Sequence, residues 1–435
     1  MKNGRVMLTD DKDKPPTLAK DAQQVAQWRP LILVVLLLAL VLRLTAAVVV
    51  ERRVQQAGRT FFIEGDANGY WHLGMAIANG DDYSVHTPTR RILRVPGFPL
   101  LLAGTICLFG DSVFAARCVL AMVGVGCCWL TWLLGSRLVM PRVGFWAALL
   151  MALHPLQIGN SVLILSENWF TFWMLAGLLA FVKLVDGPRG MPDENAKLDR
   201  EMLGRALFTG GLIAVAVLVR PGFIPWLVVA IAGVLFLLKQ SWSARLTVVA
   251  VLLVAFATVM MPWVFRNHKV TGHWVLTSLW SGPSLYDGLN PEADGTSNME
   301  FFDRENVMGT MSEYEMNAHY QHRAVEFMRT NPWTSVVLSG RKFTRFLQLA
   351  PSANSMGWAQ RAVCGAWVSM FGLLCVVGIR SQLLNPTGLL VVLGPFLLFM
   401  GVHMVFVGSL RYRLPVEFPL AILAATGLRQ WLPRK

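Results

Sequence analysis

The sequence predicts an all-α, polytopic membrane protein with about ten transmembrane helices. Of its 435 residues, 54% are hydrophobic and only 15% are charged, and the mean hydropathy is +0.50. Residues 31 to 50 are apolar apart from Arg43 and Thr45. At about 1.5 Å per residue, such a run crosses a hydrocarbon core of roughly 30 Å. Similar runs recur as far as the C-terminus.

The N-terminal segment differs from the rest of the chain. Residues 1 to 28 are polar, mixed in charge and poor in apolar residues, which is typical of disorder. We therefore expect a disordered cytoplasmic tail over residues 1 to 28 and a single transmembrane domain over residues 29 to 435.

The apolar segment 96 to 110 is too short for an ordinary crossing. It opens with Pro96 and Pro99 and ends at Gly110, so we interpret it as a re-entrant or juxtamembrane helix. This choice sets the sidedness of every later loop. The crossings that follow are expected near 113 to 135, 143 to 156, 162 to 182, 206 to 238 (a pair), 246 to 261 and 362 to 379, with two more before the C-terminus.

Basic residues then fall on one side of the membrane. The net charge is +13, and cytoplasmic loops of membrane proteins are enriched in Lys and Arg. We expect both termini in the cytoplasm and a plasma (inner) membrane location. The excess charge does not indicate nucleic acid, because the aromatic interleaving of a nucleic-acid groove is missing. The residues that this topology places in cytoplasmic turns include Arg137, Arg142, Lys183, Arg205, Lys239, Arg245, Arg380 and Arg429.

Two stretches are then extracytoplasmic and large enough to hold a site, residues 51 to 96 and residues 262 to 360. The second contains Ser312 with Glu315 three residues later, the pattern of a capping box at the start of a helix. Asn331 followed by proline should end this helix. We expect residues 262 to 360 to form a folded lid.

The first of these stretches contains two acids, Glu64 and Asp66, immediately after the first crossing. Carboxylates at this place can serve as a general base or as ligands of a hard divalent ion, and the alternative is a pair of solvated loop acids. The same loop ends with Arg90, Arg91 and Arg94. Acids and cations therefore converge on one membrane surface, where an anionic lipid headgroup would suit the cations.

Glu167 is predicted to lie inside the membrane, about five residues from the outer end of its helix. A charged side chain at the centre of a bilayer costs about 2.5 to 3.5 kcal/mol on translocon scales, so such an acid normally faces a cavity or a partner. We interpret Glu167 as a functional residue, with a structural hydrogen bond as the alternative.

Several further polar residues cluster at predicted outer helix ends. Guanidinium groups stay charged and bind phosphate oxygens with two parallel hydrogen bonds, so we expect these residues to bind a phosphate. Snorkelling, or pairing with Glu417, is the alternative. Together with Arg94 of the first loop, the predicted phosphate-binding set is Arg220, Arg266, Asn267, Arg411 and Arg413.

As an ordered set, the acidic first loop and five motifs resemble those of the GT-C polytopic glycosyltransferases, and the resemblance runs from about residue 30 to 430. The nearest branch contains bacterial proteins similar to protein O-mannosyltransferases and the lipid A aminoarabinose transferase. The motifs are RVPGFPLLLA at 94 to 103, LSEN at 165 to 168, PWVFRN at 262 to 267, SGPSLYDGLNP at 281 to 291 and RYRLP at 411 to 415.

The resemblance implies an inverting transfer of a sugar from a polyprenyl-phosphate carrier to an extracytoplasmic protein, lipid or glycan. It makes Asp66 the catalytic acid residue that acts as base, Glu167 the second acid of the cavity, and Arg411 and Arg413 ligands of the carrier phosphate. Protein O-mannosyltransferases have adjacent acids in this loop, so the spacing here leaves the role of Glu64 open. We expect no soluble C-terminal domain of the kind that some relatives have, so acceptor recognition would come from residues 262 to 360 or from another protein.

Two other classes of protein fit parts of this pattern. A flippase or transporter for polyprenyl-linked lipids would also use an intramembrane Glu167 and outer arginines, and a non-catalytic scaffold would need neither acid. The sequence requires no cofactor. It leaves open whether a divalent cation binds, and Asp66 with Glu64 or Glu167 would hold such an ion.

Overall fold

A computed structural model describes residues 18 to 187, 199 to 351 and 356 to 431, with side chains from residue 27 onward. Within these ranges the chain is helical, and its one β-type contact is an isolated bridge between Val85 and Arg90. Seven of the described helices are long and apolar enough to cross a membrane. The predicted all-α polytopic fold is confirmed.

The helices fall into three groups. The long apolar helices are α1 (Leu18–Gln56), α4 (Val113–Leu138), α7 (Ser166–Val185), α8 (Arg200–Val219), α10 (Trp242–Thr271), α16 (Trp358–Arg380) and α17 (Pro386–Val405). The shorter apolar helices are α3 (Gly97–Phe109), α5 (Pro141–Leu153) and α9 (Pro225–Leu237). The others are α2 (Asp66–Asn79), α6 (Pro155–Asn160), α11 (Ser281–Gly288), α12 (Glu300–Glu305), α13 (Val307–Thr310), α14 (Glu313–Thr330), α15 (Pro332–Phe346) and α18 (Leu410–Arg429).

Some boundaries differ from the predicted ones. Helix α1 begins at Leu18, so the last part of the expected tail is helical, while residues 1 to 17 lie outside the described residues. The crossing expected near 143 to 156 is the short helix α5, roughly 20 Å long. It ends at Leu153, because a proline follows the capping residue His154. Helix α7 begins at Ser166 rather than near residue 162. Glu167 therefore lies in the first helical turn and not a turn and a half inside the helix.

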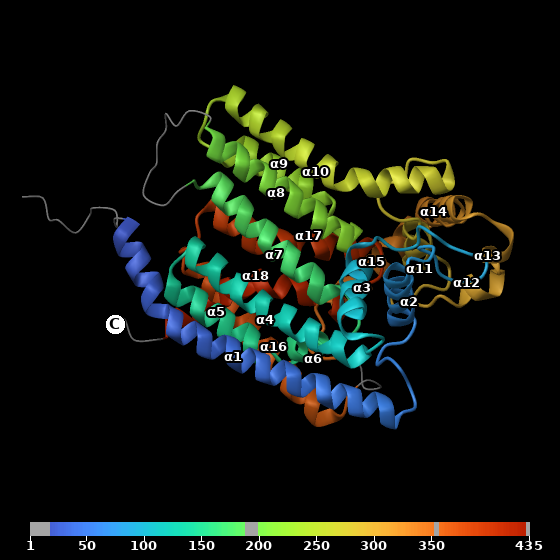
Figure 1. The fold of residues 1–435 in the computed structure, drawn as a ribbon, viewed down its shortest axis with the longest axis horizontal. Coiled ribbons are helices and arrows are strands. Elements are labelled where there is room, and N and C mark those ends of the chain that lie inside the picture. Colours follow the sequence, from blue (N-terminus) through green and yellow to red (C-terminus); the bar gives the residue numbers. More distant parts are fainter. Residues whose placement is uncertain (1–17, 188–198, 352–355, 432–435) are drawn as a thin grey trace, which may run out of the picture.

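The two ends of the bundle have different structures (Figure 1). Helices α2, α3 and α11 to α15 lie together at one end, so both segments predicted to be extracytoplasmic meet there. The beginning of α1, the turn between α9 and α10 and the end of α18 lie at the opposite end. The predicted basic turn between α9 and α10 is thus remote from the end that holds the lid.

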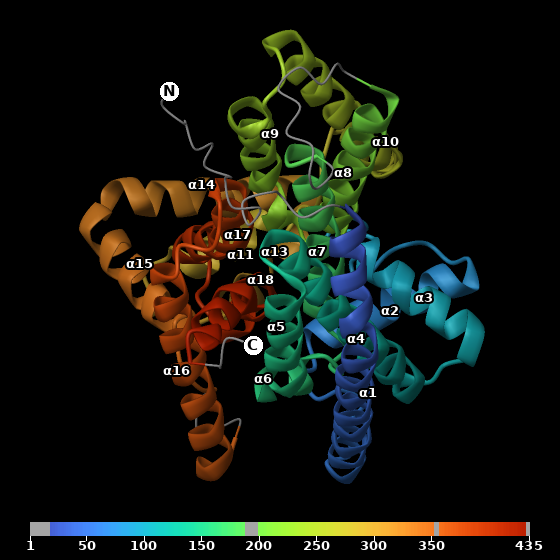
Figure 2. The ribbon, with the colours of Figure 1, turned by 90° about the vertical axis from the view of Figure 1, so that its left-hand side faces the viewer.

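Helix α18 is the centre of the bundle (Figure 2). It packs against α4, α5, α7, α16 and α17, and every residue from Arg413 to Gly427 is buried. Its sequence is polar for a membrane helix because it contains Arg411, Arg413 and Glu417. Protein rather than lipid surrounds these charges.

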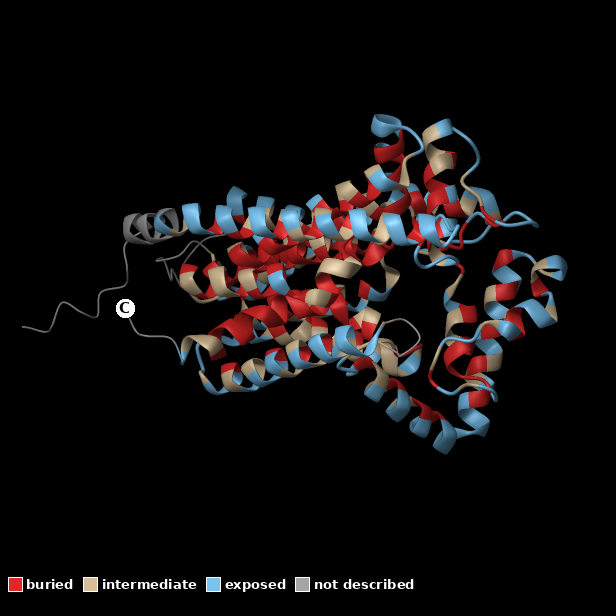
Figure 3. Cartoon of the chain, turned by 90° about the horizontal axis from the view of Figure 1, so that it is seen from below, coloured by how far each residue is buried: buried red, intermediate tan, exposed pale blue. Residues whose placement is uncertain are grey.

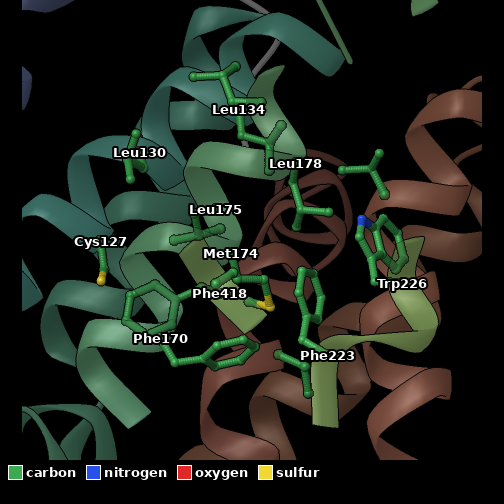
Figure 4. Close-up of a cluster of buried hydrophobic side chains, with 14 of the residues drawn as sticks. Cys127, Leu130, Leu134, Phe170, Met174, Leu175, Leu178, Phe223, Trp226 and Phe418 are labelled. Atoms are coloured by element: carbon green, nitrogen blue, oxygen red, sulfur yellow. The ribbon is translucent and has the colours of Figure 1, made fainter. Parts of the chain in front are cut away.

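Large apolar side chains fill the space between these helices. Phe170 and Met174 of α7 meet Phe223, Trp226 and Phe418 in one buried cluster (Figure 4). Buried residues concentrate in the middle of the bundle, and exposed residues cover its outside (Figure 3). Apolar side chains on the outside, such as those along α1, are the expected lipid-facing surface of a membrane protein.

The lid is folded, as predicted. The side chain of Ser312 accepts a hydrogen bond from the backbone of Glu315, and the Glu315 side chain accepts one from the backbone of Ser312, so the capping box at the start of α14 is confirmed. A second apolar core joins the lid to the first loop, and includes Tyr286, Tyr320 and Leu93. The lid and residues 51 to 96 therefore form one body.

Helices α4 and α5 approach so closely at Gly144 that a Cβ there would collide with the Trp132 carbonyl and the Ser136 hydroxyl. We expect Gly144→Ala to lower the free energy of unfolding by about 1–3 kcal/mol, the usual cost of overpacking, as measured by thermal unfolding in detergent. The matched control is Gly104→Ala in α3, where a Cβ meets no atom within 4 Å. Equal effects of the two substitutions would contradict this account.

Candidate active site

Two acids and three arginines form one continuous cluster at the lid end of the bundle. Asp66 Oδ1 accepts a hydrogen bond from Arg94 Nη2 (2.8 Å), and Oδ2 accepts one from Arg411 Nη1 (3.0 Å). Arg411 also donates through Nε to Glu167 Oε1, and Arg220 Nη1 lies 3.0 Å from the same oxygen. Arg411 thus bridges the two acids.

The ends of four helices bring this cluster together. Asp66 is the first residue of α2, Glu167 lies in the first turn of α7, Arg220 caps the C-terminus of α8, and Arg411 lies in the first turn of α18. Acids at a helix N-terminus and a cation at a C-terminus are favoured by the helix dipole. Arg411 lies at the N-terminus of α18, where the helix dipole disfavours a cation, and the two carboxylates compensate for this cost.

Close packing around Gly97 aligns these helix ends. A Cβ at Gly97 would lie 2.6 Å from the Leu218 carbonyl near the end of α8, and the Trp169 indole of α7 donates to the Gly97 carbonyl at 3.0 Å. Only glycine permits this approach. The RVPGFP motif therefore holds Arg94, three residues before Gly97, close to α7 and α8.

The cluster carries a net positive charge. Its three arginines face two carboxylates, and Glu167 Oε2 is buried without a hydrogen-bond partner. The side chain of Glu167 is 0% exposed, whereas that of Asp66 is 35% exposed. The cluster is therefore open on the side of Asp66 and lacks one negative charge, which an anionic ligand would supply.

Aromatic rings support the arginines. The Arg94 guanidinium lies 4.4 Å from the centroid of the Tyr70 ring, and Arg220 lies 5.2 Å from that of Tyr412. Such contacts with an aromatic face fix a guanidinium in place. Sequence reasoning missed both tyrosines, although Tyr70 lies four residues after Asp66 on α2, on the same helix face.

The arginines also control the charge of Asp66. Burial alone would raise the pKa of this carboxyl, but Arg94 and Arg411 hold the pKa of Asp66 well below its usual range. In turn, burial would lower the pKa of Arg94, but Tyr70 and Asp66 outweigh it and raise the pKa of Arg94. Asp66 is therefore an ionised carboxylate whose two oxygens are both engaged.

Four predicted residues lie outside this cluster, and three of them are at or near the first loop. Glu64 is exposed in the loop before α2. Arg266 donates to the backbone carbonyls of Arg91 (2.8 Å) and Tyr83 (3.0 Å), and buried Asn267 donates to the Val275 carbonyl (3.0 Å). The PWVFRN motif thus fastens the end of α10 to the first loop.

Arg413 belongs to a second buried network. Its Nε donates to Glu417 Oε1 (2.8 Å), and Glu417 Oε2 lies 3.3 Å from His154 Nε2 and 3.1 Å from Gln157 Nε2. The structure does not bring Arg413 to the cluster of Asp66. Arg413 instead pairs with Glu417, which was the alternative to phosphate binding.

The arrangement does not fit a bound divalent ion. Guanidinium groups occupy the positions around Asp66 and Glu167 from which a cation would bind. Across the described ranges, no group of three or more His, Cys, Asp or Glu side chains is placed to hold a metal.

Comparison with solved structures identifies the fold. The apo oligosaccharyltransferase of Archaeoglobus fulgidus superposes with a TM-score of 0.54 at 16% identity, over 92% of this chain and 50% of that protein. The oligosaccharyltransferase AglB of the same organism, in complex with an inhibitory peptide and a dolichol-phosphate, gives 0.52 at 15% identity, over 93% and 50%. The chain has a GT-C fold. The predicted resemblance is thereby confirmed at the level of fold.

The sequence comparison points in the same direction. The undecaprenyl phosphate-alpha-4-amino-4-deoxy-L-arabinose arabinosyl transferase of Pseudomonas aeruginosa is 27% identical over 215 residues, which are 48% of this chain and 37% of that protein. No family model matches the chain. The aligned part thus spans little more than a third of the curated relative, and the chain spans half of the solved structures.

The second network predicts a large effect on stability. Glu417→Ala would leave Arg413 buried without its carboxylate, which costs about 3–5 kcal/mol, and we expect a matching loss in thermal unfolding. The control is Glu292→Ala, which breaks the exposed pair with Arg304 (2.9 Å) and should cost less than about 1 kcal/mol. A small effect of Glu417→Ala would mean that the network is not a structural support.

Proposed function

We propose that the protein is a membrane glycosyltransferase that moves a sugar from a polyprenyl-phosphate-linked donor to an extracytoplasmic acceptor, with inversion. The observation that carries this proposal is the cluster in which a partly exposed Asp66 lies beside an excess of arginines. The proposed orientation puts both termini in the cytoplasm, the protein in the plasma (inner) membrane, and the cluster on the outer side.

The donor phosphate would take the place of the missing negative charge. Arginines bind phosphate oxygens with two parallel hydrogen bonds, and Arg220 and Arg411 both face the end of the bundle where α18 begins. The relatives support a lipid phosphate: one is named for undecaprenyl phosphate, and one solved structure holds a dolichol-phosphate.

Donor binding would also activate Asp66. In the free protein both carboxylate oxygens accept hydrogen bonds from arginines, which stabilise the ionised carboxylate and so make it a weaker base. A phosphate that binds Arg411 competes with Asp66 for the Nη1 group of Arg411 and so releases Oδ2 of Asp66. The base is then freed only when the donor is in place.

The transfer follows from this arrangement. The acceptor hydroxyl oxygen attacks the anomeric carbon from the face opposite the phosphate, and its proton passes to Asp66 Oδ2. The bond from the anomeric carbon to the phosphate oxygen breaks, and its electron pair remains on the phosphate. Arg220 and Arg411 stabilise that developing charge, while Glu167 holds both arginines in position. No step is routed through a metal.

The acceptor would be selected by the lid. Residues 262 to 360 share an apolar core with the loop that carries Arg94, so an acceptor bound on the lid would be positioned relative to Asp66. The transfer assay varies two things. One is the class of acceptor, which is a protein, a lipid or a glycan, and the other is the type of sugar, hexosyl or pentosyl.

The first test measures transfer from a panel of radiolabelled polyprenyl-phosphate sugars in proteoliposomes. Asp66→Asn removes the base, so we expect transfer to fall by about 10²- to 10⁴-fold while donor binding persists. Glu64→Gln is the matched control from the same loop and should retain most of the activity. Unchanged transfer in Asp66→Asn would remove Asp66 from the mechanism. Donor translocation without transfer would favour the flippase.

The second test uses the pH profile of the rate. Asp66 must be ionised to act as base, and Arg94 contributes to the low pKa of Asp66. Arg94→Gln should raise the pKa of Asp66, so the acid limb of kcat/KM moves to higher pH. Arg91→Gln removes the same charge from an exposed pair with Asp82 and should leave the limb in place. Equal shifts in both variants would indicate a general charge effect.

A further inference from the structure

Helix α15 of the lid buries a lysine and exposes several large apolar side chains, an unusual arrangement for a helix in water. Its buried side chains are Ser335, Leu338, Lys342 and Phe346, and the Lys342 side chain is 0% exposed. On the other face, Trp333 is 76% exposed, Val336 59% and Val337 39%. A helix in water normally buries such residues and exposes lysine.

The buried face of α15 is fastened to the bundle. Lys342 Nζ donates to the Val405 carbonyl at the end of α17 (2.7 Å). Arg413 of α18 donates to the carbonyls of Phe346 (3.0 Å) and Gln348 (2.9 Å). Gly408 packs against the backbone of Lys342, where a Cβ would collide with it. The helix is therefore not free to roll and hide its apolar face.

We propose that the exposed face of α15 lies in the lipid surface at the extracytoplasmic end of the bundle. Trp333, Val336 and Val337 would enter the boundary between headgroups and acyl chains. Arg341, which is exposed one turn after Val337, would remain among the lipid phosphates. An apolar face beside basic residues is the pattern of helices that lie in the plane of a membrane interface.

Two observations favour lipid over a second protein on this face. Exposed apolar side chains recur beyond α15, with Leu349 51% exposed, and on the crossing α16, where Trp358 is 84% and Val363 62% exposed. Figure 2 shows α15 and α16 one after the other along the same edge of the bundle. Exposed apolar side chains along the same edge as a membrane-spanning helix are expected to share its surroundings, namely lipid.

The consequence concerns the depth of the site. Arg413, which holds the end of α15, is two residues from Arg411 on α18. If α15 lies in the interface, the arginine cluster lies at the level of the lipid headgroups. This placement concerns where the lid lies and does not depend on the transfer activity.

The test uses spin labels in proteoliposomes of phosphatidylethanolamine and phosphatidylglycerol. Single cysteines replace Trp333, Val336 or Val337 in a Cys107→Ser background, because Cys107 is exposed. The references are His322→Cys on α14, whose side chain is 81% exposed, for water, and Leu33→Cys on α1, which is 64% exposed, for lipid. The Cys107→Ser protein without an added cysteine measures background labelling.

We expect the α15 labels to resemble the α1 label, with the ratio of oxygen to nickel-chelate accessibility several-fold higher than at residue 322. Access to the nickel chelate as free as at residue 322 would place the face in water and overturn the proposal. Protection from both reagents would show that a protein covers the face and would overturn it equally. Three independent positions keep the test decisive if one variant fails to fold.

Discussion

The structure depends on the burial of a charged helix in the centre of a membrane bundle. Removing an ionised side chain from water costs several kcal/mol unless a partner compensates for it. Helix α18 contains Arg411, Arg413 and Glu417, and the surrounding helices supply a carboxylate, an amide and backbone carbonyls to them. These requirements fix the rotation and depth of α18, and the position of Arg411 relative to Asp66 follows from them.

The RYRLP motif shows how one helix serves two networks. At 3.6 residues per turn, side chains two residues apart point about 200° apart around a helix. Arg411 therefore faces Asp66 and Glu167, while Arg413 faces the other way, toward Glu417 one turn later and the end of α15. Replacing either arginine would disturb a different part of the protein, although the two are almost adjacent in the sequence.

The sequence was sufficient for features that depend on local pattern or on the cost of burying charge. Hydropathy predicted the membrane fold. Charges inside the membrane or at its outer side, where they are unusual, pointed to Glu167 and Arg411, and the structure brings both together with Asp66. The partners of Arg266, Asn267 and Arg413 were not predictable, because they bind backbone carbonyls or a carboxylate on surfaces that only tertiary packing defines. The depth of Glu167 was wrong because residues 161 to 165 form turns instead of continuing the helix.

The two acids of the cluster differ in exposure, and this difference separates their proposed roles. The side chain of Glu167 is fully buried and contacts two arginines, so an acceptor hydroxyl has no path to it. Asp66 is partly exposed at the start of α2, a helix that lies beside those of the lid (Figure 1). Asp66 is accessible and hydrogen-bonded to Arg411, so an anion that binds Arg411 can release it. Glu167 is buried and keeps Arg220 and Arg411 in position throughout. The guanidinium of Arg411 thus connects donor binding, which releases Asp66, to the structural support that Glu167 provides.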